Sequence, residues 1–226
     1  MLKVRTDQVT VGQVQENRYT ILMEKNIEVE LRGPLSSEEY ATIKGFFDEN
    51  AQKKEEKDRI LIDYSTFLPG GVEERKKDIR LRVTNGVPEI IVKIGEWGGS
   101  EQRKELSVKT APGTFDLLTE IFAALGYEKG VLAVRKSHVY DYKDIEFALV
   151  EVPGHSYYFE AEKMADEGEN AEELIQEMNM VCAELGLTVF TKEHFFAYIQ
   201  KLNIEANGVF NAPEAAPNFF RENYGI

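Results

Sequence analysis

The chain has 226 residues, of which 42% are hydrophobic and 30% charged, so it can form a core and is neither disordered nor a fibrous repeat. No stretch approaches the roughly 20 uncharged apolar residues of a membrane helix, the first residues do not predict a signal peptide, and the single Cys182 excludes an internal disulfide framework. The net charge of −13 disfavours nucleic acid and anionic membranes, which bind basic surfaces. We therefore expect a soluble, cytoplasmic globular protein that binds neither nucleic acid nor membranes.

The first third of the chain predicts two strands that flank a helix. Residues 27–32 alternate apolar and charged side chains with a period of two, which is typical of a half-buried strand. Ser36-Ser37-Glu38-Glu39 forms a capping box, which predicts a helix that ends near Asn50. The charged run at residues 53–58 is interpreted as a solvated helix end or loop, and residues 60–67 as the second strand.

Hairpins follow in the middle of the chain. Residues 79–84 and 88–94 are predicted strands on either side of Asn85-Gly86, a dipeptide that favours a type I′ turn. Gly98-Gly99-Ser100 predicts a second hairpin turn, which leads into a strand at residues 102–109.

A short helix then precedes three more strands. Thr114 is the candidate N-cap of this helix. Strands are predicted at residues 131–142, 144–152 and 157–163. The predicted apolar stripe of the helix consists of Leu117, Leu118, Ile121, Phe122 and Leu125.

The C-terminal part of the chain changes to a helical period. A helix is predicted from Ala171 to Gly186, a last helix starts near Thr191, and the tail that contains Pro213 and Pro217 is interpreted as loop. The whole order gives about eight strands, mostly joined by hairpins, with helices in three places. Eight antiparallel strands suffice to close a barrel that holds side chains or one small ligand.

Several predicted strands carry paired charges at positions i and i+2, which places both side chains on one face about 6.5–7 Å apart. Such pairs are usually the solvated faces of half-buried strands. Solvated faces mix the two signs, however, whereas here acids gather on the first and last strands and bases on the middle strands. The acids are Glu28, Glu30, Glu151, Glu160 and Glu162, and the bases are Arg80, Arg82, Lys93 and Arg103.

A charged barrel interior is unfavourable unless ions compensate it. Carboxylates that hold a partly hydrated divalent cation suit Mg²⁺ or Mn²⁺. Arginine and lysine neutralise the charge on phosphate oxygens. The two clusters together therefore favour a site for a divalent metal and a polyphosphate.

The first strand carries a family resemblance. Glu28-Val29-Glu30-Leu31-Arg32 resembles the E-x-E-x-K signature of the CYTH, or triphosphate tunnel metalloenzyme, superfamily, which includes class IV adenylyl cyclases, thiamine triphosphatases and inorganic tripolyphosphatases. The order of the charged motifs that follow is also similar, over residues 26–203. These motifs are Ile79-Arg80-Leu81-Arg82, Lys93, Arg103-Lys104-Glu105, Val134-Arg135-Lys136, Glu151 before Pro153-Gly154, Tyr158-Phe159-Glu160-Ala161-Glu162 and Glu184-Leu185-Gly186-Leu187.

This resemblance implies an α+β fold, in which an eight-stranded antiparallel β-barrel forms a tunnel with a polar lumen and helices packed outside. Residues 26–203 would form the tunnel domain. Residues 1–25 would be an N-terminal extension with an additional strand or hairpin, and residues 204–226 a C-terminal tail.

The resemblance also implies roles for single residues. Glu28, Glu30, Glu160, Glu162 and Glu151 would bind the metal. The triphosphate would be bound by Arg32, Arg80, Arg82, Lys93 and Arg103, with Arg32 and Lys93 also catalytic, and by Arg135 or Lys136. Because side chains alternate along a strand, Arg135 and Lys136 cannot both face the lumen, and the sequence leaves the choice open. Arg32 stands where the signature has lysine. The positive charge is kept, but an arginine does not replace a lysine that acts as a movable point charge or gives up a proton.

Three classes of function remain open. The first is an enzyme that acts on a small-molecule triphosphate with Mg²⁺ or Mn²⁺, either as an adenylyl cyclase or as a triphosphatase. The second is a tunnel that binds polyphosphate or a nucleotide without turnover, although binding alone would need only the bases. The third is a barrel without ligand. A homodimer is an open alternative to a monomer in each class.

Overall fold

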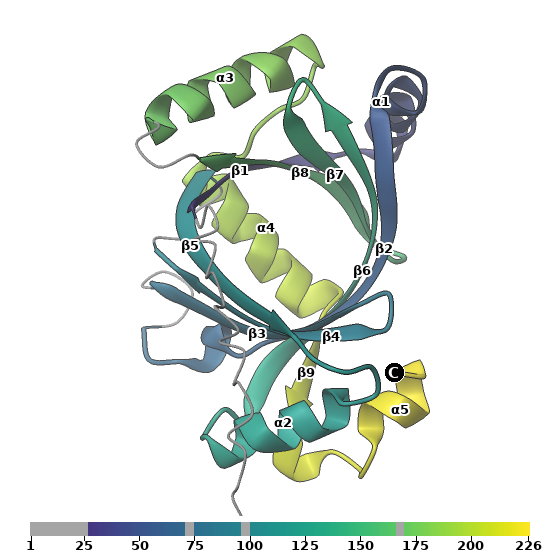
Figure 1. The fold of residues 1–226 in the computed structure, drawn as a ribbon, viewed down its shortest axis with the longest axis vertical. Coiled ribbons are helices and arrows are strands. Elements are labelled where there is room, and N and C mark those ends of the chain that lie inside the picture. The colour runs from purple at the N-terminus through teal and green to yellow at the C-terminus, as the bar shows by residue number, and fades with distance from the viewer. Residues whose placement is uncertain (1–26, 71–74, 96–99, 166–169) are drawn as a thin grey trace, which may run out of the picture.

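The computed structural model describes residues 27–70, 75–95, 100–165 and 170–226, which form nine strands and five helices (Figure 1). The strands are β1 (Ile27–Leu35), β2 (Gln52–Asp63), β3 (Lys77–Thr84), β4 (Val87–Ile94), β5 (Ser100–Lys109), β6 (Lys129–Tyr142), β7 (Ile145–Val152), β8 (Ser156–Ala165) and β9 (Gly208–Asn211). The helices are α1 (Ser37–Asn50), α2 (Phe115–Ala124), α3 (Ala171–Glu184), α4 (Lys192–Glu205) and α5 (Phe219–Tyr224). The additional strand expected in residues 1–25 and the turn at Gly98-Gly99 lie outside the described residues.

Eight of the strands close into an antiparallel barrel. They pair in the order β2-β3-β4-β5-β1-β8-β7-β6, and the pairing of β2 with β6 closes the ring. The ninth strand, β9, pairs with the beginning of β6. The predicted α+β fold with an eight-stranded antiparallel barrel is therefore confirmed.

Alternation along β1 shows how the barrel is built. Val29 and Leu31 are fully buried on the outer face of the wall, while Glu28, Glu30 and Arg32 face the interior. The outer face packs against α1 and α3, which cover β1, β8, β7 and β6 (Figure 1). The apolar half of each alternating strand thus forms the core between wall and helices, and the charged half lines the lumen.

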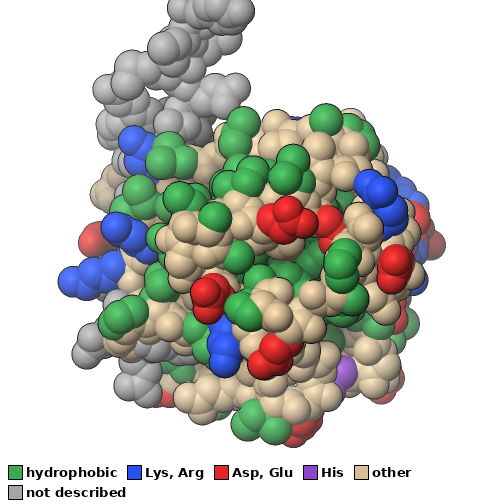
Figure 2. Space-filling model, turned by 90° about the horizontal axis from the view of Figure 1, so that it is seen from below, with side chains coloured by type: hydrophobic (Ala, Val, Ile, Leu, Met, Phe, Trp, Pro, Cys, Tyr) green, Lys and Arg blue, Asp and Glu red, His purple; other side chains and the backbone are tan. Residues whose placement is uncertain are grey.

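A second core lies at the opposite side of the barrel. Leu81 of β3 and Ile62 of β2 pack there against Phe115 and Phe122 of α2. Only Leu118 and Phe122 of the predicted apolar stripe are buried, because Leu117, Ile121 and Leu125 are exposed, Leu125 by 68%. Figure 2 shows this end of the molecule, where hydrophobic side chains lie among acidic ones.

The charged run at residues 53–58 is not a helix end or loop, as the sequence led us to expect. It belongs to β2, which pairs with β6 along its length, with an irregularity between Lys53 and Glu55. Lys54 lies 3.4 Å from a carboxylate oxygen of Asp141 and donates to Glu146 at 2.9 Å. Opposite charges on neighbouring strands stabilise this segment where apolar side chains are absent.

The expectation that the tail is loop is also wrong. Phe210 of β9 and Phe220 of α5 are buried in the second core, with ring centroids 5.1 Å apart. Asp116 of α2 accepts hydrogen bonds from the backbone N–H groups of Phe220 and Arg221, at 2.9 and 3.2 Å. The fold of the described residues therefore extends past residue 203.

Helix α4 lies across an opening of the barrel instead of on its outer wall (Figure 1). It begins after Thr191, whose side chain accepts from the backbone N–H of His194, as expected for an N-cap. The loop that leads into α4 touches β1 at Gly33, where a Cβ atom would lie 1.9 Å from the carbonyl oxygen of Thr188. Only glycine permits this close approach. Among the described helices, none is long and apolar enough to cross a membrane.

Candidate active site

The barrel and α4 enclose a cavity of about 420 Å³, within the range of small-molecule sites. All eight barrel strands contribute side chains to its lining. Charged residues dominate the part formed by β1, β3, β4, β5 and β8.

Three carboxylates meet on one wall of this cavity. Glu28 and Glu30 of β1 and Glu162 of β8 have carboxylate oxygens that all lie within 4.8 Å of one another. Glu30 and Glu162 are direct partners in the antiparallel register of β1 and β8. Like charges at directly opposed positions destabilise a sheet unless a cation lies between them.

The electrostatics of the acids divide them into two kinds. Burial and the neighbouring Glu28 and Glu30 raise the pKa of Glu162 well above its usual range. Burial also raises the pKa of Glu30 to about 7, against the opposing effect of Arg32 and Lys93. Glu160 behaves differently, because Arg32 and Arg59 outweigh its burial and lower its pKa to about 2.

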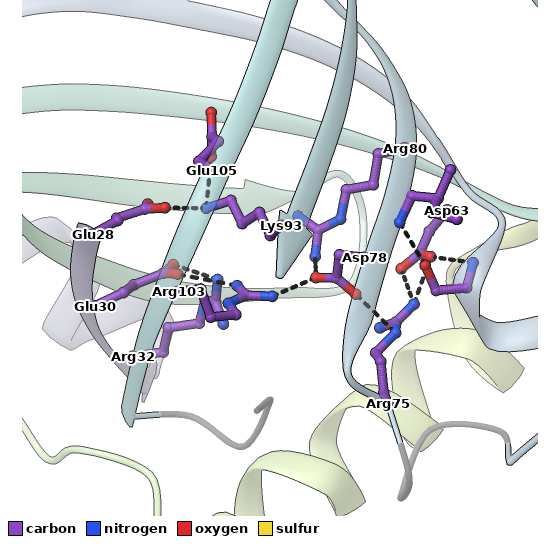
Figure 3. Close-up of polar contacts among 12 residues, drawn as sticks. Glu28, Glu30, Arg32, Asp63, Arg75, Asp78, Arg80, Lys93, Arg103 and Glu105 are labelled. Atoms are coloured by element: carbon purple, nitrogen blue, oxygen red, sulfur yellow. Dashed lines mark hydrogen bonds and ion pairs between the residues drawn. The ribbon is translucent and has the colours of Figure 1, made fainter. Parts of the chain in front are cut away.

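Strands β3, β4 and β5 carry bases that are bonded to acids, and Figure 3 shows several of these pairs. Lys93 of β4 lies 2.5 Å from Glu28 and 3.0 Å from Glu105 of β5. Burial acts to lower the pKa of Lys93, but Glu30 and Glu28 hold that pKa above its usual value, which favours the charged form of Lys93. On β3, the guanidinium of Arg82 donates to Glu89 at 2.7 Å.

A chain of alternating charges extends from Arg103 to the end of β2 (Figure 3). Asp78, which is 1% exposed, accepts from Arg80 and from Arg103 at 2.5 Å each. Arg75 lies 2.8 Å from the other oxygen of Asp78 and donates to Asp63 at 2.5 Å. The arginines are thereby fixed in place inside the lumen instead of extending into solvent.

Two donors in the lumen remain unused. The Nε–H groups of Arg59 and Arg80 are buried and have no hydrogen-bond partner among the described residues. Both carboxylate oxygens of Glu30 likewise accept no hydrogen bond there, although they lie near the guanidinium groups of Arg32 and Arg103. Buried polar groups without partners in a lined cavity point to a polar ligand that supplies the missing contacts.

The acid cluster fits a divalent cation. It offers oxygen ligands from Glu28, Glu30 and Glu162, the ligand type that Mg²⁺ and Mn²⁺ prefer. A bound cation would relieve the repulsion that raises the pKa values of Glu30 and Glu162.

Comparison with known proteins identifies the fold. No protein-family model and no curated protein matches the chain. Solved structures do match. The PH1819 protein of Pyrococcus horikoshii OT3 superposes with a TM-score of 0.61 and 21% identity, over 77% of this chain and 98% of the other.

Two further structures have names that refer to an activity. A candidate adenylate cyclase from Vibrio parahaemolyticus has a TM-score of 0.56 and 14% identity, over 72% of this chain and 90% of the other. A candidate adenylyl cyclase from Hippeastrum, described as having a dominant triphosphatase activity, has a TM-score of 0.54 and 15% identity. The match covers 78% of this chain and 95% of the other. The chain has the CYTH fold.

The CYTH barrel brings most of the predicted site residues together. The cavity lining includes Glu28, Glu30, Arg32, Arg80, Arg82, Lys93, Arg135, Glu160 and Glu162, and Arg103 lies beside it, 3.6 Å from Glu30. The choice between Arg135 and Lys136 is settled by the register of β6, since Arg135 and Ser137 line the cavity and Lys136 is exposed outside.

Glu151 is not a metal-side acid in this CYTH barrel. Its neighbour Val150 lines the cavity, and Glu151 pairs with Lys136 in the register of β6 and β7, on the outer face. There, together with burial, Glu151 raises the pKa of Tyr40 of α1. The prediction placed Glu151 on the right strand but on the wrong face, because β7 is apolar on both faces and shows no alternation.

Sequence reasoning missed the acids among the bases of the CYTH barrel. Asp78 and Glu105 lie two residues from Arg80 and Arg103, so the same i, i+2 rule could have placed them in the lumen. Glu89, Asp63 and Arg75 carried no such signal. The expected segregation of acids from bases therefore holds for the carboxylate cluster only.

Proposed function

We propose that the protein is a metal-dependent enzyme that cleaves a phosphoanhydride bond of a triphosphate compound. The observation that carries this proposal is the cluster of Glu28, Glu30 and Glu162 beside the arginine and lysine side chains of β3, β4 and β5, within one cavity. A cation site and an anion site that adjoin each other match a metal-bound triphosphate better than either ion alone.

The chain's own residues have distinct tasks in this proposal. Glu28, Glu30 and Glu162 hold the cation, which when bound polarises phosphate oxygens. The guanidinium groups of Arg80, Arg82 and Arg103 neutralise the charge on the phosphates. Each is already bonded to an acid, but a guanidinium has five N–H donors, so donors remain for phosphate oxygens.

Lys93 and Arg32 contact the acids on β1 and β8 directly. Lys93 bonds Glu28, and Arg32 bonds Glu160 through Nε at 3.2 Å and contacts Glu30. Because its acidic neighbours favour its charged form, Lys93 serves as a cation beside the phosphate chain. The attacking group is either water, in a triphosphatase, or a hydroxyl of the substrate itself, in a cyclase.

Incubation of the purified protein with ATP and with tripolyphosphate, each with Mg²⁺ and with Mn²⁺, tests the proposal. Chromatography that resolves phosphate, pyrophosphate and cyclic AMP distinguishes the two reactions. We expect turnover that is lost when the divalent metal is chelated and in the Glu28→Gln variant. Ligand-dependent thermal stabilisation without any turnover would instead make the protein a binding tunnel.

A further inference from the structure

Two arginines that line the cavity, Arg59 of β2 and Arg135 of β6, have no acidic partner among the described residues. Arg135 donates to two neutral acceptors, the carbonyl of Val134 at 2.7 Å and the side chain of Asn207 at 2.9 Å. The guanidinium of Arg59 makes no hydrogen bond within the described ranges, and its Nε–H group is buried. The other basic residues of the lining each have an acidic partner, and they are Arg32, Lys57, Arg75, Arg80, Arg82 and Lys93.

The pairing of β2 with β6 places these two arginines directly opposite each other. Arg59 and Arg135 are Cα partners in the antiparallel register, and both side chains face the lumen. Directly opposed like charges destabilise a sheet, and a low-dielectric interior strengthens their repulsion. The Glu160 carboxylate does not neutralise this pair, because it is bonded to Arg32, at 3.2 Å, and not to either of the two arginines. An anion between the two guanidinium groups would remove the repulsion.

Two hydroxyl groups beside the arginine pair also lack partners. Thr84 of β3 is the Cα partner of Arg59 on the other side of β2, and Ser137 lies two residues after Arg135 on the same lumen face. The hydroxyl oxygens of Thr84 and Ser137 are buried and make no hydrogen bond among the described residues, and Ser137 is only 3% exposed. Since buried polar groups are nearly always paired, unpaired groups on three neighbouring strands indicate a ligand that bonds them.

The donors of this group fit a doubly charged oxyanion. A guanidinium presents five N–H donors in a planar fork that matches the oxygens of a phosphate, and each hydroxyl adds one donor. Two positive charges without acidic partners require about two negative charges, which a phosphate group carries near neutral pH. Because the group contains no carboxylate, it does not need a metal ion to bind this anion.

The arginine pair lies across the lumen from the carboxylate cluster. In the ring of strands, β2 is four strands away from β1 in both directions, so Arg59 is on the wall opposite Glu28 and Glu30. Both walls line the same cavity of about 420 Å³, which is larger than one phosphate group needs. The cavity can therefore hold one ligand at the carboxylate cluster and a separate anion at the arginine pair.

We propose that Arg59 and Arg135, with the hydroxyl groups of Thr84 and Ser137, form a second oxyanion site that binds a free phosphate ion. This site binds phosphate without a metal ion and at the same time as a ligand at the carboxylate cluster. The inference goes beyond the proposed function, because it requires neither turnover nor the residues that hold the cation. A triphosphatase would release the same ion into this cavity.

Calorimetric titration of the full-length protein with inorganic phosphate tests the site, in a chloride buffer that contains a chelator. We expect one phosphate ion to bind per chain and to raise the melting temperature, because a ligand of the folded state stabilises that state. Arg59→Gln and Arg135→Gln should each lower the affinity for phosphate by about tenfold or more, since each variant removes charged hydrogen bonds.

Two further measurements guard against trivial explanations. Lys136→Gln is the matched control, because it removes the same charge from the residue next to Arg135, which is exposed on the outer face, and it should change the phosphate affinity by no more than about twofold. Without phosphate, Arg59→Gln should melt at the same temperature as the wild type or higher, because it removes one of two opposed cations. A loss of phosphate affinity in this variant is then not a loss of the fold.

A competition experiment distinguishes a free phosphate ion from a phosphate group of the substrate. With Mg²⁺ and saturating diimidotriphosphate, a non-hydrolysable triphosphate, inorganic phosphate should still bind. Displacement of phosphate by diimidotriphosphate would overturn the separate site, as would an affinity that both arginine variants leave intact or a wild type that binds no phosphate. A protein that binds phosphate in the expected way but has no turnover would refute the proposed function and leave this inference standing.

Discussion

Arg103 on β5 and Asp78 on β3 form an ion pair at 2.5 Å across the intervening strand β4. Both side chains lie almost fully inside the barrel wall. The Asp78 oxygen that Arg103 contacts also accepts from Arg80. One buried carboxylate therefore fixes two of the cations inside the barrel, and this dependence can be tested.

Asp78→Asn should lower the free energy of unfolding by about 3 kcal/mol, because removal of one partner leaves buried arginines without compensation. Urea denaturation followed by circular dichroism measures this change. The matched control is Glu120→Gln on α2. Glu120 is exposed, so the effect of its substitution should stay within about 0.5 kcal/mol. An Asp78→Asn protein as stable as the wild type would mean that the arginines do not need this acid.

The contribution of Asp78 to stability should also depend on pH. Arg80 and Arg75 outweigh the burial of Asp78 and hold its folded-state pKa well below the usual range. In the unfolded chain the pKa is about 3.9. A lowered pKa stabilises the fold above the unfolded value, and this contribution is lost as pH falls below it. The stability difference between wild type and Asp78→Asn should thus be constant from pH 7 to pH 5 and shrink below about pH 4. A difference that grows on acidification would contradict this.

Three acid-to-amide variants test the metal site. Glu28→Gln and Glu162→Gln should weaken the binding of Mn²⁺ by roughly 10- to 100-fold or more, since each removes a charged ligand from the cluster. Glu151→Gln is the control, because Glu151 lies on the outer face of β7. Titration of Mn²⁺ monitored by electron paramagnetic resonance gives the three affinities directly. A loss of Mn²⁺ affinity in Glu151→Gln as large as in the other two variants would mean that Glu151 belongs to the metal site.

The sequence predicted most strands of the barrel because their apolar and charged residues alternate, as in β1 and β3. It missed the first half of β2, where residues 53–58 are charged on both faces and no period of hydrophobicity exists. It also missed β9 and α5. Those elements are short, and they depend on contacts with distant residues such as Asp116, which a local pattern cannot reveal.

The sequence predicted those parts of the candidate site in which charged side chains alternate with apolar ones along a strand. Glu28 and Glu30, and Arg80 and Arg82, were assigned correctly to the lumen because each pair shares a strand face. The part of the cavity lining that α4 contributes, which includes Phe195 and Tyr198, was not predicted, since nothing in a sequence shows that α4 lies across the barrel opening. That position depends on a close contact at Gly33, between segments far apart in the chain.

Adjacent residues on β3 should behave in opposite ways. Arg82→Ala should raise KM for the triphosphate and lower kcat, because Arg82 faces the lumen and would neutralise phosphate charge. Leu81→Ala should instead cost about 2–5 kcal/mol of stability, because Leu81 is fully buried on the outer face against α2. Steady-state kinetics and urea denaturation of both variants check the pair. Unchanged kinetics in Arg82→Ala would remove Arg82 from the substrate site.

The arrangement of the arginines also predicts that the protein does not bind duplex DNA or RNA at physiological salt. Binding to a duplex needs several Lys and Arg side chains along an exposed face, each of which displaces counterions from the phosphates. Here Arg80, Arg82, Arg103 and Lys93 lie inside the barrel and are already bonded to acids, and the whole chain has a net charge of −13, so these bases do not form an exposed basic face. On the face in Figure 2, Lys and Arg side chains are scattered and acidic groups lie between them. A fluorescence anisotropy titration with a labelled duplex should show no binding at micromolar protein. Micromolar binding that weakens steeply with added salt would reveal a continuous basic face and would contradict the enclosed site.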